Sequence, residues 1–169
     1  MVNLIIYGSL LNADEVAGED ANFVERRLVR VRKHQRLFNM VSTRKINERE
    51  AAVLNVRPAE GHHFNALMLH GVDAPSLARF DAREYGYDRL EVAPGLVEVQ
   101  GEPLGKSLPI YMYYGRPERI AASGIVPIPF YLDICTGGAA QWGQDFLAEF
   151  KKTTFVDNHV ELIDYMDGL

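Results

Sequence analysis

The chain lacks most of the features on which disulfide-rich and membrane-spanning proteins depend. Its single cysteine, Cys135, excludes an intrachain disulfide and is typical of a reducing compartment. No apolar run approaches the roughly 20 residues that a membrane-spanning helix needs. Residues 1–11 also lack the basic start and the long apolar centre of a secretory leader. We therefore expect a cytoplasmic protein whose partners do not include a membrane.

An excess of positive charge is also missing. The formal net charge is -5 and the pI is near 5.5, whereas nucleic-acid-binding domains are usually basic. One local exception is the segment from Glu25 to Arg36, which carries six Lys or Arg residues against one Glu. Its interleaved apolar residues favour a strand with one solvated face, and it has no aromatic side chains on which bases could stack. The sequence therefore predicts no nucleic-acid partner.

Familiar nucleophile and metal motifs are absent as well. Ser9 does not lie in a Gly-x-Ser-x-Gly elbow, and Cys135 has no evident histidine partner, so we interpret Cys135 as a small buried hydrophobe. Three histidines, His62, His63 and His70, have no acidic or cysteine ligand at a metal-like spacing. Neighbouring histidines on a strand would also point to opposite faces. The sequence predicts neither a catalytic triad nor a metal site.

The most distinctive stretch lies at the start of the chain. A run of branched apolar residues at 4–6, flanked by Val2 and Tyr7, predicts a short strand that is buried on both faces and ends at Gly8. Gly8 can take a positive φ and approach a ligand closely, and Ser9 adds a hydroxyl and its own N–H. Successive N–H groups in such a turn can form a nest for a carboxylate or an oxyanion. The alternative is that the strand simply needs a glycine in order to turn.

The remaining pattern favours one α+β domain spanning residues 1–169, with 47% hydrophobic residues to build its core. Asn12 predicts the start of a short helix that ends near Gly18. Strands are expected at 51–56 and 64–70, as a hairpin around Pro58 and Gly61, and at 96–99 and 108–114. A helix is expected from Pro129 to a C-cap at Gly137, followed by an aromatic core stripe at Trp142, Phe146 and Phe150. We expect residues 156–169 to form an acidic tail that packs either on the rest of the domain or on a second subunit. The sequence therefore leaves open whether the protein is a homodimer.

Glu84 is a carboxylate at a position where the helical pattern predicts a hydrophobic residue. Asp73 predicts the N-cap of a helix that ends near Gly86, and Leu77 and Phe80 mark its apolar face. Glu84 continues that stripe at i+7, where a hydrophobe is expected, and such conflicts occur at functional sites. Desolvation there would raise its pKa toward the range of a general acid or base. The competing interpretation is a structural ion pair with Arg89 or with a basic residue of segment 26–36.

Three stretches together resemble the gamma-glutamylcyclotransferase-like family. They are Tyr7-Gly8-Ser9-Leu10 after the first strand, the motif Phe80-Asp81-x-Arg83-Glu84-x-Gly86-Tyr87, and the tyrosine-rich strand Tyr111–Tyr114. Two mild departures are Phe80, where the family has leucine, and the absence of a glycine in 66–70. The resemblance covers roughly residues 2–115, and the helical tail from about 127 to 169 is similar to the C-terminal extension of some bacterial members.

The resemblance implies a small mixed β-barrel of about six strands with flanking helices, in which the Tyr-Gly-Ser-Leu loop forms the floor of a pocket. It implies a gamma-glutamyl cyclotransferase that releases 5-oxoproline and an amine or amino acid from a small gamma-glutamyl compound, without metal or cofactor. Glu84 is then the general acid and base. Tyr7, Gly8, Ser9 and Leu10 bind substrate together with Tyr113 or Tyr114, of which we favour Tyr113.

Two other functions stay open at this stage. One is a modification step on a biosynthetic gamma-glutamyl intermediate, which would use the same residues. The other is a non-catalytic small-molecule binding or regulatory module, because a shared fold does not by itself carry an activity. The presence of Glu84 on the apolar stripe favours an enzyme. The sequence does not identify the amine or amino acid that the reaction would release, because no sequence pattern shows which loops come together to bind it.

Overall fold

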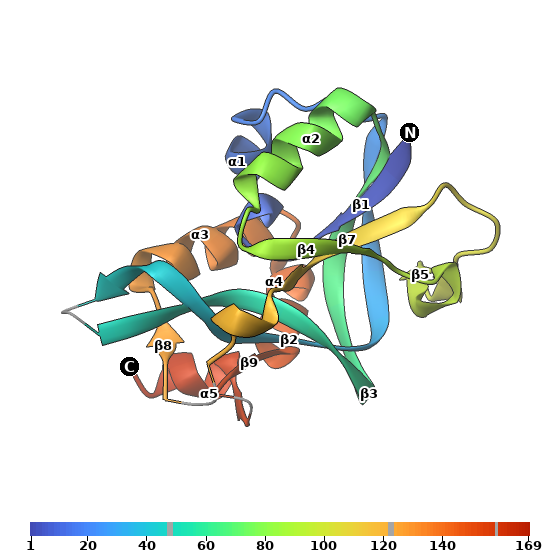
Figure 1. Ribbon diagram of the computed structural model, residues 1–169. Helices are drawn as coiled ribbons and strands as arrows, with labels where there is room; N and C mark the ends of the chain where they lie inside the picture. Colours follow the sequence, from blue (N-terminus) through green and yellow to red (C-terminus); the bar gives the residue numbers. More distant parts are fainter. Residues whose placement is uncertain (47–48, 122–123, 158) are drawn as a thin grey trace.

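The computed structural model describes residues 1–46, 49–121, 124–157 and 159–169 (Figure 1). The longer strands are β1, β2, β3, β4 and β7; their bounds are Val2–Ile6, Glu25–Ile46, Arg49–Val72, Tyr87–Glu91 and Ile110–Gly115. The short strands are β5 (Val97–Val99), β6 (Glu102–Pro103), β8 (Val126–Pro127), β9 (Thr154–Val156) and β10 (Val160–Glu161). The α-helices are α1 (Ala13–Ala17), α2 (Ala74–Arg83), α3 (Pro129–Ala140), α4 (Gln144–Lys152) and α5 (Leu162–Asp167). Single 3-10 turns are η1 (Ser9–Leu11), η2 (Pro94–Leu96) and η3 (Pro117–Arg119).

The strands form one strongly curved mixed sheet, a half-barrel, in the order β10-β9-β2-β3-β1-β7-β4. In this order β1 is central: it runs antiparallel to β3 on one side and parallel to β7 on the other. Burial on both faces explains its continuous apolar sequence, because four of its five residues are buried. The α+β fold with a mixed sheet and flanking helices is confirmed. The sheet is an open half-barrel, and its described strands outnumber the six expected for the small mixed β-barrel.

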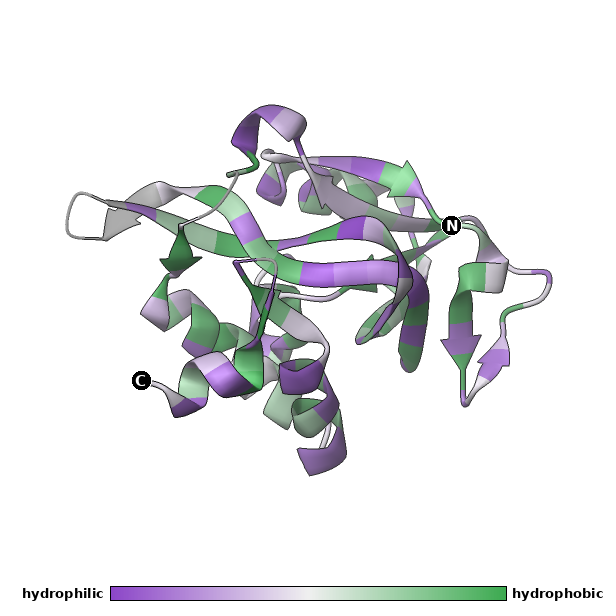
Figure 2. Cartoon of the chain, turned by 90° about the horizontal axis from the view of Figure 1, so that it is seen from below, coloured by the Kyte–Doolittle hydropathy of each residue, from purple (hydrophilic) through white to green (hydrophobic). Residues whose placement is uncertain are grey.

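Helices α1 and α2 lie side by side at the top of Figure 1, and α5 lies at the bottom, with the curved sheet between them. Figure 2 shows both hydrophobic and hydrophilic segments along the curved strands. The hydrophobic residues meet in one core, which includes the fully buried rings of Phe38, Phe64, Phe80 and Phe150. This core holds β1 and the start of β4 in place, and these two elements position the site described below.

The predicted hairpin of residues 51–56 with 64–70 is wrong. Both segments belong to the single strand β3, and each pairs with a different part of β2. Pro58 and Gly61 do not form a turn; Pro58 pairs with His34, and the register shifts between Arg32 and His34 instead. Gly61 has a φ of +78° and Lys33 a φ of +55°, so the sequence signal marks a bend in a continuous ribbon rather than its end. His62 and His63 therefore lie on the strand and not in a turn.

Two predicted helix ends also differ from the structure. Gly137 is not a C-cap, since α3 continues to Ala140. Its neighbour Gly138 is required for packing, because a Cβ there would lie 2.4 Å from the backbone nitrogen of Asn12. Gly86 is not a left-handed cap of α2, which ends earlier, at Arg83, with Glu84 as its C-cap residue.

The tail packs on the body of the same chain. Strand β9 runs parallel to β2, and the side chains of Val156 and Leu162 are buried, at 3% and 0% exposed. Phe146 and Phe150 of α4 join the core, as the aromatic stripe predicted, while Trp142 packs against it and donates from its indole N–H to the carbonyl of Leu11. Of the helices in the described ranges, none combines the length and the apolar character that crossing a membrane requires.

Candidate active site

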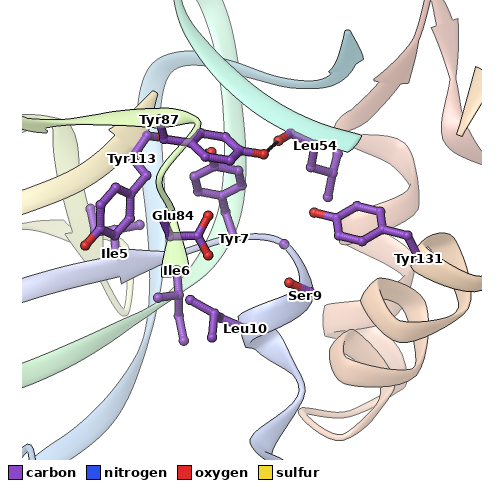
Figure 3. A pocket seen from close by; sticks show the side chains of 11 residues that line it. Ile5, Ile6, Tyr7, Ser9, Leu10, Leu54, Glu84, Tyr87, Tyr113 and Tyr131 are labelled. Carbon is purple, nitrogen blue, oxygen red and sulfur yellow. Dashed lines mark hydrogen bonds between the residues drawn. The ribbon is translucent and has the colours of Figure 1, made fainter. Parts of the chain in front are cut away.

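A narrow pocket opens where β1, the end of α2, β7 and α3 meet (Figure 3). Its floor is the loop after β1, and its side walls are mostly aromatic. The lining residues are Ile5, Ile6, Tyr7, Gly8, Ser9, Leu10, Leu54, Glu84, Tyr87, Tyr113 and Tyr131. All the residues predicted for the site, from the opening loop, from α2 and from β7, therefore line one pocket.

The carboxylate of Glu84 points into this pocket among the tyrosine side chains (Figure 3). Its backbone is held at two points, because its N–H donates to the carbonyl of Phe80 and its own carbonyl accepts from the N–H of Tyr87, both at 2.9 Å. The side chain is only 18% exposed. Burial raises the pKa of Glu84 to about 7, although the nearby charge of Arg83 opposes the shift. This carboxyl group can therefore both accept and release a proton near neutral pH.

The ion pair that competes for Glu84 is different from the one expected. Arg89 does not reach it; the Nε of Arg89 lies 3.2 Å from Asp81 instead. Arg83 lies nearest, with its Nε 3.4 Å from Oε1 of Glu84, but it also binds the carboxylates of Glu15 and Glu19. Since one guanidinium is shared among three carboxylates, it does not neutralise Glu84 alone. Burial therefore outweighs the effect of Arg83, and the charge of Glu19 adds to the rise in the pKa of Glu84.

The loop after β1 lines the pocket with Gly8, Ser9 and Leu10. Leu11 and Asn12 donate their N–H groups back to the carbonyls of Gly8 and Ser9, which closes the η1 turn. The N–H groups of Gly8, Ser9 and Leu10 precede these bonds, and within the described part of the chain no carbonyl accepts from them. Such unpaired N–H groups at the start of a turn suit a carboxylate or an oxyanion.

Gly8 is needed for space rather than for a positive φ. Its φ is -122° and its ψ is -129°, which is not the left-handed region considered from the sequence. A Cβ at this position would lie 3.0 Å from the hydroxyl oxygen of Tyr131 and 3.7 Å from Leu54. The missing side chain lets Tyr131 from α3 close over the loop.

The tyrosine walls are fixed by hydrogen bonds. The hydroxyl of Tyr7 donates to the carbonyl of Tyr113 at 2.7 Å, and that of Tyr87 donates to the carbonyl of Leu54 at 2.6 Å. Tyr113 donates its own hydroxyl to Asp81 at 2.8 Å. Tyr114 does not line the pocket; it lies 2.9 Å from Nε2 of His34. Neighbouring residues on β7 thus point to opposite faces, and Tyr113 is the one beside Glu84.

Five pocket residues were not anticipated from the sequence: Ile5, Ile6, Leu54, Tyr87 and Tyr131. Tyr87 could have been found, since it follows Glu84 by three residues within the same motif. Leu54 and Tyr131 come from β3 and α3, and no local pattern links them to the loop. Cys135 is fully buried, as predicted, and burial raises the pKa of its thiol to about 12. Among the residues that the structure describes, no three His, Cys, Asp or Glu side chains are grouped as a metal site.

No family model and no curated protein matches the chain by sequence. Solved structures do match over most of its length. A gamma-glutamyl cyclotransferase superposes with a TM-score of 0.67 at 18% identity, covering 99% of both chains. An uncharacterised human protein reaches 0.61 at 18% identity over 90% of this chain and 87% of its own.

A third structure, the yeast gamma-glutamyl cyclotransferase specific to glutathione, reaches a TM-score of 0.55 at 14% identity. It covers 82% of this chain and 77% of the yeast protein. At these identities the comparisons establish the fold. The resemblance to the gamma-glutamylcyclotransferase-like family is thus confirmed for the architecture.

Proposed function

We propose that the chain is a gamma-glutamyl cyclotransferase, which converts a small gamma-glutamyl compound into 5-oxoproline and a free amine or amino acid. The observation that carries this proposal is the position of Glu84, a buried carboxyl with a pKa of about 7, in the pocket floored by the Gly8–Leu10 N–H groups. A shared fold supports the proposal but does not identify a substrate.

The reaction needs one proton carrier. Glu84 accepts a proton from the α-ammonium group of the substrate, and the freed nitrogen attacks the γ-carbonyl carbon to close a five-membered ring. The bond from this carbon to the departing nitrogen then breaks, and Glu84 returns the proton to that nitrogen. The proton that Glu84 takes up in the first step is thus released in the second, so the carboxylate is regenerated. The ring nitrogen loses its second proton to solvent as the lactam forms, and the released amine takes up a proton from solvent to become an ammonium ion.

The loop and the tyrosine walls would contribute to the rate by positioning the substrate. Because attack is intramolecular, the main requirement is to hold the glutamyl chain folded, and correct orientation lowers the barrier substantially. The N–H groups of residues 8–10 would bind the α-carboxylate or the oxyanion that develops on the γ-carbonyl. The rings of Tyr7, Tyr87 and Tyr131 would exclude water from the reacting atoms.

The test is release of 5-oxoproline from a panel of gamma-glutamyl dipeptides, gamma-glutamyl amines and glutathione. Glu84→Gln removes the carboxylate with little change in shape, and we expect a loss of about 10²–10⁴ in rate. Glu91→Gln is the matched control, since Glu91 is exposed on β4 and should leave the rate unchanged. If no compound yields 5-oxoproline but thermal-shift titration detects binding, the alternative of a binding module replaces this proposal.

A further inference from the structure

Arg83 is the last residue of α2, next to Glu84, and its guanidinium reaches three carboxylates. Its Nε lies 3.4 Å from Oε1 of Glu84. Its Nη1 donates to Glu19 at 2.7 Å, and its Nη2 donates to Glu15. Glu15 belongs to α1, and Glu19 follows the end of that helix by two residues. The proposed acid and base therefore shares its nearest cation with two carboxylates of another segment.

The guanidinium holds these partners unequally. Its two Nη groups make direct hydrogen bonds to Glu15 and Glu19. Its Nε lies 3.4 Å from Glu84, which is longer than the roughly 2.7–2.9 Å of a charge-assisted hydrogen bond. Nη2 also reaches Oγ of Ser9, in the loop that lines the pocket, at 3.5 Å. Arg83 thus attracts the Glu84 carboxylate without the close contact that it makes with the other two.

The cluster is partly buried and unbalanced in charge. Its four charged side chains are between 18% and 33% exposed, so water screens their interactions less than on an open surface. Three carboxylates face one guanidinium, and full ionisation leaves an excess of negative charge. Burial raises the pKa of Glu84, the charge of Arg83 opposes this rise, and the charge of Glu19 adds to it. The pKa of Glu84 therefore depends on which carboxylate Arg83 binds most closely.

The other groups around Glu84 do not compete with Arg83 for this role. The titratable side chains on the pocket walls are all tyrosines: Tyr7, Tyr87, Tyr113 and Tyr131. Burial raises the pKa of each, so they stay uncharged below about pH 10. Asp81 pairs with Arg89, and Arg119 donates to the carbonyl of Val41. Within the described part of the chain, Arg83 is the cation in ion-pair contact with Glu84.

We infer that Arg83 is a positioning residue for Glu84, and that Glu15 and Glu19 limit its hold by competing for the same guanidinium. The inference rests on the proposed function and deepens it. A guanidinium bound to Glu84 alone would favour the carboxylate and oppose its uptake of a proton from the substrate. Without any guanidinium, the carboxyl would stay protonated at neutral pH and could not accept that proton. The competition keeps Glu84 between these two limits.

The test is the pH dependence of kcat/KM for 5-oxoproline release, measured on the panel compound that reacts fastest. Arg83→Gln should move the midpoint of the profile upward by about one pH unit, because an opposing positive charge is lost. Glu15→Gln and Glu19→Gln should each move it downward by about half a unit, because Arg83 is then free to bind Glu84. Arg83→Lys should recover part of the shift, since it keeps the charge but not the fork.

Opposite shifts separate this role from a purely structural one. If Arg83 only tethered α1 to α2, removing either partner would weaken the same tether, and the midpoint would stay in place or move in one direction for all three variants. Either result would overturn the inference. The matched control is Arg79→Gln, one turn earlier on α2, which removes an exposed arginine that donates to the carbonyl of Asp20 and should leave the midpoint unchanged.

A second measurement does not depend on turnover. The carboxyl carbon of Glu84, labelled with ¹³C and assigned by its loss in Glu84→Gln, can be titrated by NMR in each variant. We expect the same upward and downward shifts as in the kinetic profiles. If 5-oxoproline is released but neither measurement shows opposite shifts, the inference fails and the proposed function stands. If the NMR shifts appear but no panel compound reacts, the competition for Arg83 stands and the proposed function fails.

Discussion

The guanidinium of Arg36 and the carbonyl of Tyr7 meet on the core side of the opening loop, with Nη1 of Arg36 3.5 Å from the oxygen. Because a trans peptide is planar, the N–H of Gly8 points to the opposite side of the peptide from that oxygen. Gly8 itself lines the pocket. Arg36 is fully buried, and within the described part of the chain it forms no ion pair. A buried cation thus lies behind the loop that is proposed to bind an anion.

Arg36 should stabilise both the fold and this loop. Its guanidinium donates to Asn65 and Thr154 and lies 4.0 Å from the ring centre of Phe150. Burial lowers its pKa to about 9, so it stays charged at neutral pH. We expect Arg36→Met to cost about 2–4 kcal/mol, because several buried acceptors lose their donor, and Arg36→Lys to cost less.

Thermal denaturation measures this effect. Arg57→Met is the control, since Arg57 is exposed and its guanidinium donates to the side chain of Gln35. Surface changes of this kind are usually within about 0.5 kcal/mol. If Arg36→Met and Arg57→Met melt at the same temperature, Arg36 has no such role.

The pH dependence of the proposed reaction should reflect Glu84. The carboxylate form accepts the first proton, so kcat/KM should rise with pH and level off above the pKa of about 7. Rates of 5-oxoproline release measured from pH 5 to 9 test this. The residual activity of Glu84→Gln should lack the step near 7, and a step of the same size in that variant would assign the titration to another group.

Glu84 should also reduce stability at high pH. Its folded pKa is raised above the ordinary value, so the folded state binds the proton more tightly than the unfolded state does. Stability therefore falls as pH rises from about 4.5 to about 7 and is constant above that, with a total change of about 3 kcal/mol at about 1.4 kcal/mol per pKa unit. We expect Glu84→Gln to melt a few degrees higher than the wild type at pH 8. The advantage should shrink at pH 5, and a variant less stable than the wild type at pH 8 would contradict the burial of this charge.

Tyr113 and Tyr114 form a matched pair for testing the pocket wall. Tyr113→Phe removes a hydroxyl beside Glu84, one that Asp81 orients, and we expect kcat/KM to fall about tenfold, as for the loss of one hydrogen bond. Tyr114→Phe removes a hydroxyl that faces His34 and should change kcat/KM by less than twofold. The reverse order of effects would place the substrate on the other side of β7.

The sequence predicted the parts of the site that depend on local rules. The burial of β1, the N-cap at Asp73 and the stripe from Leu77 to Glu84 all follow from short-range patterning, and the structure confirms the cap through the bond from the Ser76 N–H to Asp73. The position of Glu84 was visible because a carboxylate replaced an expected hydrophobe.

The features that the sequence did not predict depend on packing between residues that are far apart along the chain. The basic segment 25–36 was interpreted as a strand with a solvated face, yet Arg36 at its end lies in the core, where rings and carbonyls from distant elements surround it. Tyr131 enters the pocket only because α3 packs on η1. Pro58 and Gly61 led to the wrong prediction of a turn, because proline and glycine can bend a continuous strand as well as end one.

The central place of β1 also determines when the pocket can exist. Strand β2 and strand β3 are neighbours along the chain and can pair early, whereas β1 pairs with residues near 70 and near 110. Contacts between distant residues form slowly, because a long loop must close first. During refolding, the pocket should therefore form after β2 and β3 have paired. A molecule that binds in the pocket would then indicate that β1 has paired with both β3 and β7, two strands that are synthesised much later.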